Sequence, residues 1–328
     1  MATSKGKQPE RQALVPPLPN PATGSANPAA SLSSLWAYLL PALNHIIKSP
    51  TNNISKAPAI DVEFYSGIHS ACYNYITAQT ENYNSRKNED TTLTTGTDLY
   101  GQLDKFFADT ARELLLGAPQ DDSSLIDYII PCFNRYSAGA QSVNRLLNYV
   151  NRHYVKRAVD EDKGWLSIND VLEHVARTVT VSDTREKLSN KLKEKRLDEL
   201  KKWGYSDGDP AEALILAESC AEAASSLDRI IPIASLALRR FRVEFVEPLL
   251  AVPKVKRKGK NKPMKTPNGT TPKGRLARAV KELLESKEMV EDERRRIAGE
   301  LALILRKIGV IGPLRKRLDK YSSSLSEG

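Results

Sequence analysis

The sequence predicts an all-α protein built from helical bundles. Three observations support this fold class. Apolar residues recur every three or four positions through most of the chain, and no segment alternates apolar and polar residues as a half-buried strand would. Capping residues, glycines and prolines fall at the ends of these apolar patterns. Nothing approaches about 18 consecutive apolar residues, so we expect no membrane partner.

The composition limits the class of protein. The chain has 328 residues, of which 40% are hydrophobic, enough for one or two domains with a core or for a short helical array. The three cysteines are odd in number and widely spaced, which argues against a disulfide framework and favours a reducing compartment. We expect each cysteine to be a small buried apolar residue.

The N-terminal arm and the first helices follow from the pattern. Residues 1–33 are expected to be a disordered arm, because residues 1–31 hold six prolines among small polar residues and no apolar signal region. Ser33 or Ser34 can cap the first helix, and Pro41 can kink it. Gly117 is a natural stop for the third helix. The first five expected helices are 34–48, 60–79, 97–116, 123–136 and 141–159.

Helical patterns continue to near residue 308. Ser167 begins a capping box before the sixth helix, and Asp209-Pro210 is an N-cap and N1 pair. A polar tail, 313–328, ends the chain. The later helices are expected after Ser167 and over 183–203, 210–225, 229–250, 274–286 and 290–308.

One segment carries the positive charge of the chain. Residues 254–275 hold nine basic residues and no acidic one, and their removal leaves 40 basic and 40 acidic residues. The segment could be a soluble loop, a nuclear localisation signal or a nucleic-acid contact. The remaining chain has no overall basic bias, so a nucleic-acid partner is not expected. We expect a cytoplasmic and nuclear protein.

No catalytic motif stands out. The four histidines and three cysteines show no zinc-ligand spacing, and there is no glycine-rich phosphate loop or nucleophile elbow. We therefore expect no enzyme, no cofactor and no metal site. The prominent pattern is aromatic: Tyr65, His69 and Tyr73 are four residues apart and share one helix face. Spacing alone leaves open whether they lie in the core or at an interface.

Two sequence blocks resemble the cullin family. LNYVNRHYVKRAVDED, residues 147–162, is similar to the end of the fifth helix in the first cullin repeat, where a Tyr-Leu-Asn-Arg-His-Trp pattern precedes basic residues and Asp-Glu. Here Tyr154 replaces the Trp. YSGIHSACYNYIT, residues 65–77, resembles the second helix of that repeat. The residues that match the fifth-helix pattern are Tyr149, Asn151, Arg152 and His153.

The resemblance implies cullin-repeat helical bundles stacked as a short solenoid-like stalk. It covers a first repeat, 34–163, and less specifically a partial second repeat, 230–312, with the basic linker 251–273. Residues 164–229 then form a helical insertion. Its long helix, 183–203, is charged and is expected to be exposed to solvent. Nothing resembles the cullin C-terminal domain, so a RING-box partner is not expected.

The resemblance also implies a partner. In cullins, helices two and five bind an adaptor of the BTB/Skp fold, which holds an F-box-type substrate receptor. Ser66 stands where F-box-type cullins carry a larger apolar residue, whereas Asn151, His153 and Tyr154 are implied to pack the helix into its bundle. Carried over by position, the adaptor-binding residues are Tyr65, Ser66, His69, Tyr73, Tyr149 and Arg152.

The function implied is that of a non-catalytic scaffold of a ubiquitin ligase. Such a chain would support ubiquitin-dependent degradation or compete with full-length cullin for the adaptor. The alternative is a nucleic-acid-binding helical-repeat protein that uses residues 254–275.

Overall fold

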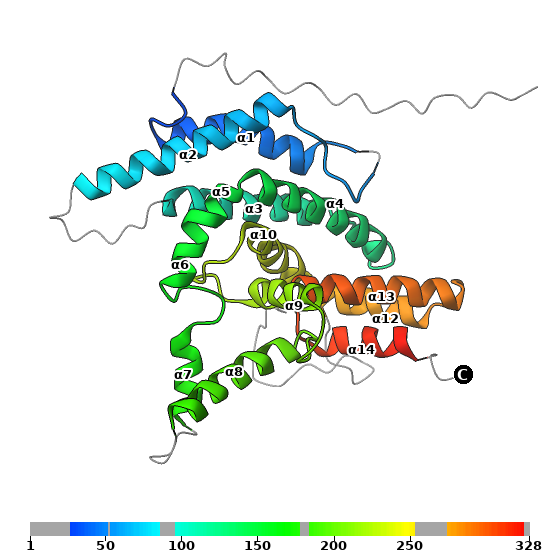
Figure 1. The fold of residues 1–328 in the computed structure, drawn as a ribbon. Coiled ribbons are helices and arrows are strands. Elements are labelled where there is room, and N and C mark those ends of the chain that lie inside the picture. Colours follow the sequence, from blue (N-terminus) through cyan, green and yellow to red (C-terminus); the bar gives the residue numbers. More distant parts are fainter. Residues whose placement is uncertain (1–26, 52, 86–95, 178–183, 253–273, 325–328) are drawn as a thin grey trace, which may run out of the picture.

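A computed structural model describes residues 27–51, 53–85, 96–177, 184–252 and 274–324. These residues form helices and connecting loops without a strand, which confirms the predicted fold class (Figure 1). The helices are α1 (Leu32–Lys48), α2 (Val62–Ser85), α3 (Thr97–Leu116), α4 (Leu125–Leu146), α5 (Asn148–Val150), η2 (Asn151–Val155), α6 (Lys156–Asp160), α7 (Ile168–Ala176), α8 (Arg185–Lys201), α9 (Ala211–Ala224), α10 (Ile233–Phe241), η3 (Arg242–Val246), α11 (Glu247–Leu250), α12 (Arg275–Glu285), α13 (Glu291–Lys307) and α14 (Pro313–Ser323).

The helices lie in successive layers (Figure 1). α1 and α2 form the first layer, and α3, α4 and α5 form the next. α9 and α10 lie below them, beside α12, α13 and α14. α7 and α8 extend away from these layers as a hairpin.

α1 begins earlier than predicted. Ser31 is its N-cap, and the Ser31 hydroxyl accepts a hydrogen bond from the amide of Ser34 at 3.2 Å. The helix runs through Pro41 without a break and buries one apolar face, which includes Leu35, Leu39 and Leu43. The end of the predicted disordered arm is therefore helical from Leu32, and residues 1–26 lie outside the described residues.

The predicted gap between the fourth and fifth helices was wrong. α4 continues through residues 137–140, because their small side chains let the backbone approach α1. A Cβ atom on Gly139 would lie 2.6 Å from the Ile47 Cδ1 atom. The chain instead breaks at Leu147, whose φ and ψ of −101° and 26° separate α4 from α5.

α10 is the central helix of the structure. It packs against α3, α4 and α9, and every residue in it except Arg240 is buried. Six of its nine residues are apolar, and burial of nearly the whole helix requires neighbours on almost all sides. Two tyrosines of the surrounding helices bind the backbone of α10 and of the segment before it: the Tyr136 hydroxyl donates to the Ala237 carbonyl at 3.0 Å, and the Tyr100 hydroxyl donates to the Ile231 carbonyl at 2.9 Å.

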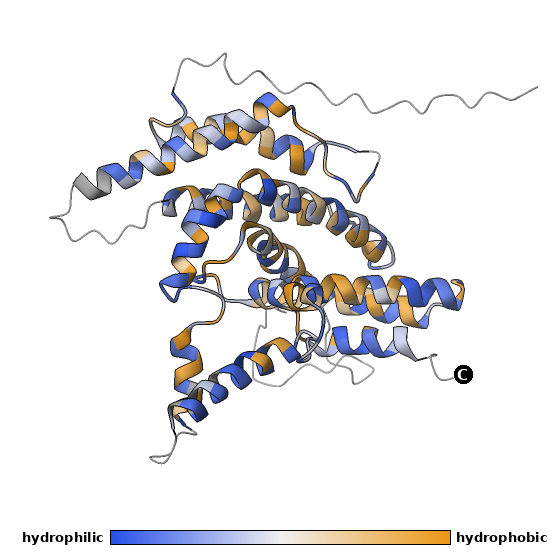
Figure 2. Ribbon diagram, in the orientation of Figure 1, coloured by the Kyte–Doolittle hydropathy of each residue, from blue (hydrophilic) through white to orange (hydrophobic). Residues whose placement is uncertain are grey.

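The predicted insertion divides into two structural parts. The last helix of the predicted insertion, α9, packs against α10 and carries buried Ala217 and Ala223. This helix is therefore part of the core. α8 is mostly hydrophilic along its length (Figure 2). Of the expected apolar edge, Leu200 and Trp203 are buried beside Cys220, whereas the side chains of Leu188 and Leu192 lie outside the described set.

The C-terminal tail was also predicted incorrectly. α14 begins with Pro313 directly after Gly312, a favourable helix start, and packs against α13. Leu318 is fully buried there. This short helix was missed in the sequence analysis because only about two of its apolar side chains need to face the core. Two such positions give little helical periodicity.

Two further sequence-based details are refined. Ser167 is the N-cap of α7, as predicted, with its hydroxyl accepting from the Asn169 amide at 3.0 Å, but the predicted capping box is not formed because the Asp170 carboxylate pairs with Arg229 at 2.6 Å. α9 begins one residue later than predicted, so that Pro210 is the N-cap and Asp209 accepts from the Ser206 amide at 2.7 Å. Within the described residues, no helix combines the length and apolarity needed to cross a membrane.

Arg239 on α10 fixes the connection from α9. The side chain is 1% exposed, and its Nη1 donates to the carbonyl oxygens of Ser226 at 2.7 Å and Arg229 at 2.8 Å. Burial lowers the pKa of this guanidinium. The hydrogen bonds offset part of the cost of burying the charge.

Arg239→Met is expected to lower the free energy of unfolding by about 2–4 kcal/mol, because the carbonyls of Ser226 and Arg229 lose a charged donor. The measurement is urea denaturation followed by circular dichroism. Arg317→Met, on the exposed face of α14, is the matched control and is expected to have little effect. Equal stability of the two variants would contradict this role.

Glu222 on α9 makes stability depend on pH. The Ser235 hydroxyl on α10 donates to Glu222 Oε2 at 2.5 Å. Burial, together with the nearby Glu218, raises the pKa of Glu222 to about 7 from its ordinary value of 4.5, against the opposing hydrogen bond from Ser235. The folded state therefore holds this proton more tightly than the unfolded chain, and the free energy of unfolding falls as pH rises from about 4.5 to about 7.

Glu222→Gln is expected to remove this part of the pH dependence, because the amide does not ionise. The free energy of unfolding of the parent, relative to the variant, is predicted to fall by about 1–3 kcal/mol between pH 5 and pH 8. Urea titrations of both proteins at the two pH values measure it. The same change in both proteins would show that other groups cause the dependence.

Candidate protein-binding surface

α2 exposes the aromatic residues that its spacing brings to one face. Phe64, Ile68 and Cys72 recur at four-residue intervals and are buried against the bundle. One position further along, Tyr65, His69 and Tyr73 follow the same interval on the exposed face, with Tyr65 41% and Tyr73 48% exposed. The apolar packing of one side of the helix therefore sets the direction of the other.

Tyr149 of α5 lies at the centre of this surface. Its ring stacks on His153 with centroids 4.0 Å apart, and the edges of Tyr73 and His69 meet it at 5.4 and 5.9 Å. Such pairs contribute about 0.5–1.5 kcal/mol each beyond area burial. We name this group the aromatic patch; its members are Tyr65, His69, Tyr73, Tyr149 and His153.

The structure places all six sequence-predicted residues on α2, α5 and η2, with exposed or half-exposed side chains. His69, Tyr73 and Tyr149 are in ring contact, and the Tyr65 hydroxyl donates to the Arg145 carbonyl at 3.2 Å. Ser66 and Arg152 are exposed beside them. In the part of the chain that the structure describes, neither makes a hydrogen bond or ring contact with the other four.

His153 was wrongly expected, from the sequence, to pack the helix into its bundle. Its side chain is exposed and stacked on Tyr149. The four-residue spacing between the two was the signal that could have found it. Tyr154 is buried, as expected, and its ring packs 5.1 Å from that of Tyr100.

Asn151 connects the patch to the core. Its side-chain nitrogen donates to Asn144 Oδ1 at 2.8 Å, and its Oδ1 accepts from the Ile233 amide at 3.1 Å. Asn144 Oδ1 also accepts from the Ala234 amide at 3.1 Å. The first amides of α10 are thus capped by side chains from α4 and η2, which fixes the segment that carries Tyr149 and His153.

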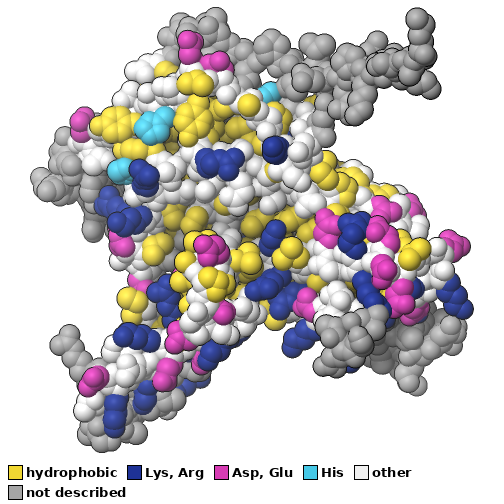
Figure 3. Space-filling model, turned by 45° about the vertical axis from the view of Figure 1, so that its right-hand side comes forward, with side chains coloured by type: hydrophobic (Ala, Val, Ile, Leu, Met, Phe, Trp, Pro, Cys, Tyr) yellow, Lys and Arg dark blue, Asp and Glu magenta, His cyan; other side chains and the backbone are white. Residues whose placement is uncertain are grey.

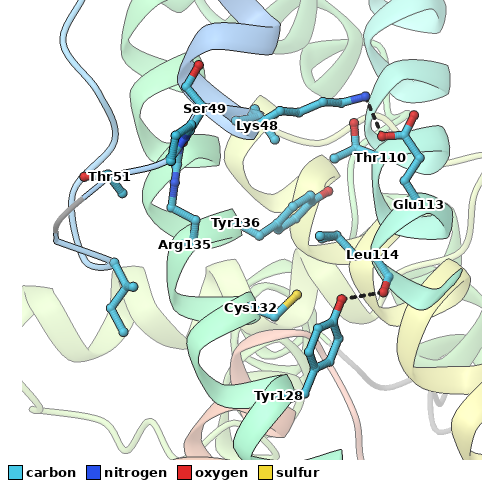
Figure 4. Close-up of a pocket in the computed structure, with 13 residues that line it drawn as sticks. Lys48, Ser49, Thr51, Thr110, Glu113, Leu114, Tyr128, Cys132, Arg135 and Tyr136 are labelled. Carbon is cyan, nitrogen blue, oxygen red and sulfur yellow. Dashed lines mark hydrogen bonds and ion pairs between the residues drawn. The ribbon is translucent and has the colours of Figure 1, made fainter. Parts of the chain in front are cut away.

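A cavity of about 460 Å³ lies elsewhere, between α1, α3 and α4 (Figure 4). Its wall includes the ion pair of Lys48 with Glu113, at 2.6 Å, and the thiol of Cys132. Burial raises the pKa of Cys132 to about 12, so the thiol stays protonated at neutral pH and is a poor nucleophile. None of the six predicted site residues lines this cavity.

Cys72 and Cys220 are buried free thiols, as expected, whereas Cys132 is only half-buried. Burial raises the pKa of Cys72 to about 12. Among the described residues, no group of three or more His, Cys, Asp or Glu side chains is arranged to hold a metal ion.

Comparison with known proteins gives two partial similarities. Over 171 residues, 49% of this chain, the sequence is 20% identical to Cell division control protein 53 of Saccharomyces cerevisiae and covers 20% of that protein. Over 69 residues, 21% of this chain, it is 32% identical to Cullin-1 of Dictyostelium discoideum and covers 9% of that protein.

The matched stretches therefore span a fifth or less of these curated relatives. No family model and no solved structure matches the chain. The two similarities agree in kind with the resemblance in the aromatic blocks, and they support a distant, cullin-like relationship.

Proposed function

We propose that the chain is a non-catalytic, cullin-like scaffold segment that binds a BTB/Skp-type adaptor of a cullin-RING ubiquitin ligase. The observation that carries the proposal is the aromatic patch. Four rings from α2, α5 and η2 are in contact on the surface, with Tyr149 at their centre, and Tyr65 lies on the same exposed face of α2 as His69 and Tyr73. Tyrosine is enriched at the energetic centres of protein interfaces because it combines large apolar area with a polar tip.

The patch is also held in place before any partner binds. The Tyr149 ring is fixed by His153 and Tyr73, and the adjacent Val150 is fully buried. Phe64 and Ile68 anchor the opposite face of α2. Because few side chains must be ordered on binding, less of the interaction energy is lost to conformational entropy.

A scaffold of this kind acts by geometry. A rigid helical stalk that holds an adaptor and its F-box-type receptor fixes the position of a bound substrate relative to the ubiquitin-loading machinery, and catalysis gains from proximity. A polypeptide of these 328 residues that occupies the adaptor would also exclude a full-length cullin from the same adaptor surface.

The nucleic-acid alternative rests on residues 254–275, of which 254–273 lie outside the described residues. Arg275 is described, and its charge is used within the fold: its Nη2 donates to the Pro119 carbonyl, and its Nε lies 3.6 Å from Asp122 Oδ1. The alternative stays a prediction for the remainder of the segment.

The double substitution Tyr65→Ala/Tyr149→Ala is expected to weaken adaptor binding at least about 30-fold, because interface hot spots contribute about 2 kcal/mol or more. The measurement is a pull-down and calorimetric titration of the full chain against a purified Skp-type adaptor. Leu116→Ala/Ile215→Ala is the control; these side chains are 85% and 65% exposed and lie outside the patch.

Two results would count against the proposal. Equal affinity of the double variant and the parent would show that the adaptor binds elsewhere. No binding by a parent whose circular dichroism spectrum is helical would show that the chain does not recognise this adaptor class.

Overexpression of the chain is expected to slow the degradation of substrates that depend on the adaptor, because it competes with full-length cullin. A chase of substrate levels after protein synthesis is stopped measures this effect. The Tyr65→Ala/Tyr149→Ala chain, expressed at the same level, is the control and should leave turnover unchanged. Unchanged turnover with the parent chain would contradict competition.

A further inference from the structure

Three cationic side chains border the aromatic patch on one edge. Arg145 lies in the last turn of α4, Arg152 lies in η2 beside His153, and Lys156 is the first residue of α6. All three side chains are exposed. The Tyr65 hydroxyl bonds to the carbonyl of Arg145, so this edge is adjacent to the patch. We name Arg145, Arg152 and Lys156 the basic edge.

The face is polarised in charge. Figure 3 shows Lys and Arg side chains along one side of the exposed His and hydrophobic side chains, with Asp and Glu side chains farther out both beyond these cations and on the other side. On the first side, the charges that directly border the patch are therefore positive. A partner with the complementary pattern would be favoured in one orientation.

The basic edge lacks compensation within the fold. Farther along the same segment, Arg157 and Lys163 both form ion pairs with Glu161, at 3.2 and 2.9 Å. Arg145 donates to the hydroxyl of Ser142 at 2.9 Å, and no carboxylate within the described ranges forms an ion pair with any of the three edge cations. Their charge remains available to a partner.

We infer that the partner of the aromatic patch presents carboxylate side chains to the basic edge, and that this pairing speeds association and sets the orientation of docking. This inference rests on the proposed function. Opposite charges steer encounter over about one Debye length, about 8 Å at physiological salt. The guanidinium of Arg152 can also hold a carboxylate through two parallel hydrogen bonds.

The test compares two charge reversals in the full chain. Arg152→Glu/Lys156→Glu changes the basic edge, and Lys316→Glu/Lys320→Glu makes the same change in net charge on exposed positions of α14, far from α5 and α6 (Figure 1). Association and dissociation rates with a purified Skp-type adaptor are measured at about 50 mM and about 500 mM salt. The Tyr149→Ala variant is measured beside them.

The expected result is an association rate at least about tenfold lower for the basic-edge variant at low salt, with a much smaller difference at high salt. The α14 variant should associate like the parent, and Tyr149→Ala should mainly speed dissociation. If the basic-edge variant is less stable to urea than the parent, Arg152→Gln/Lys156→Gln removes the charge without reversal and should give a smaller decrease of the same kind.

The outcomes separate the two proposals. Adaptor binding by the parent at the same rate as the basic-edge variant would overturn the inference and leave the proposed function standing. Failure of the folded parent to bind the adaptor at either salt concentration would overturn the proposed function, and this inference with it.

Discussion

The complete burial of α10 is the constraint on which the rest of the structure depends. Because the helix is apolar on almost all sides, α3, α4 and α9 must cover it, and its polar groups must be satisfied from within. Arg239 binds the carbonyls of the preceding loop, while Asn144 and Asn151 cap its first amides. The hydrogen bond of Asn151 also affects the surface, because Asn151 belongs to the segment that carries Tyr149.

The aromatic patch is therefore a consequence of the core. α2 turns its tyrosines outward because Phe64, Ile68 and Cys72 occupy the inward positions. η2 contains a π-helical turn, a feature found often at functional sites. Within it His153 stacks on Tyr149, so the exposed rings of the aromatic patch are held by residues that also have structural contacts.

This arrangement suits recognition better than chemistry. The cavity between α1, α3 and α4 is walled by a protonated thiol and an internal ion pair, whereas the patch offers exposed rings with a charged border. The partial similarities to Cell division control protein 53 and Cullin-1 support a distant, cullin-like relationship, which agrees in kind with the proposed scaffold role. In such a protein the exposed side chains determine which partner binds, and the buried helix α10 keeps the fold rigid.

The sequence by itself determined the all-α class, most helix positions, the capping of α7 by Ser167 and the shared helix face of Tyr65, His69 and Tyr73, whereas the exposure of that face came from the tertiary structure. These follow from local periodicity and capping, which act within one helix. Only the tertiary structure decided the continuous α4, the buried side of α9, the helix α14 and the exposure of His153. Each depends on a contact between helices: α9 packs on α10, α14 packs on α13, Gly139 allows close approach of α1, and the hydrogen bonds of Asn151 to α4 and α10 orient the turn that carries His153. Side chains with the same local pattern can face the core or the solvent, and the neighbouring helices choose between them.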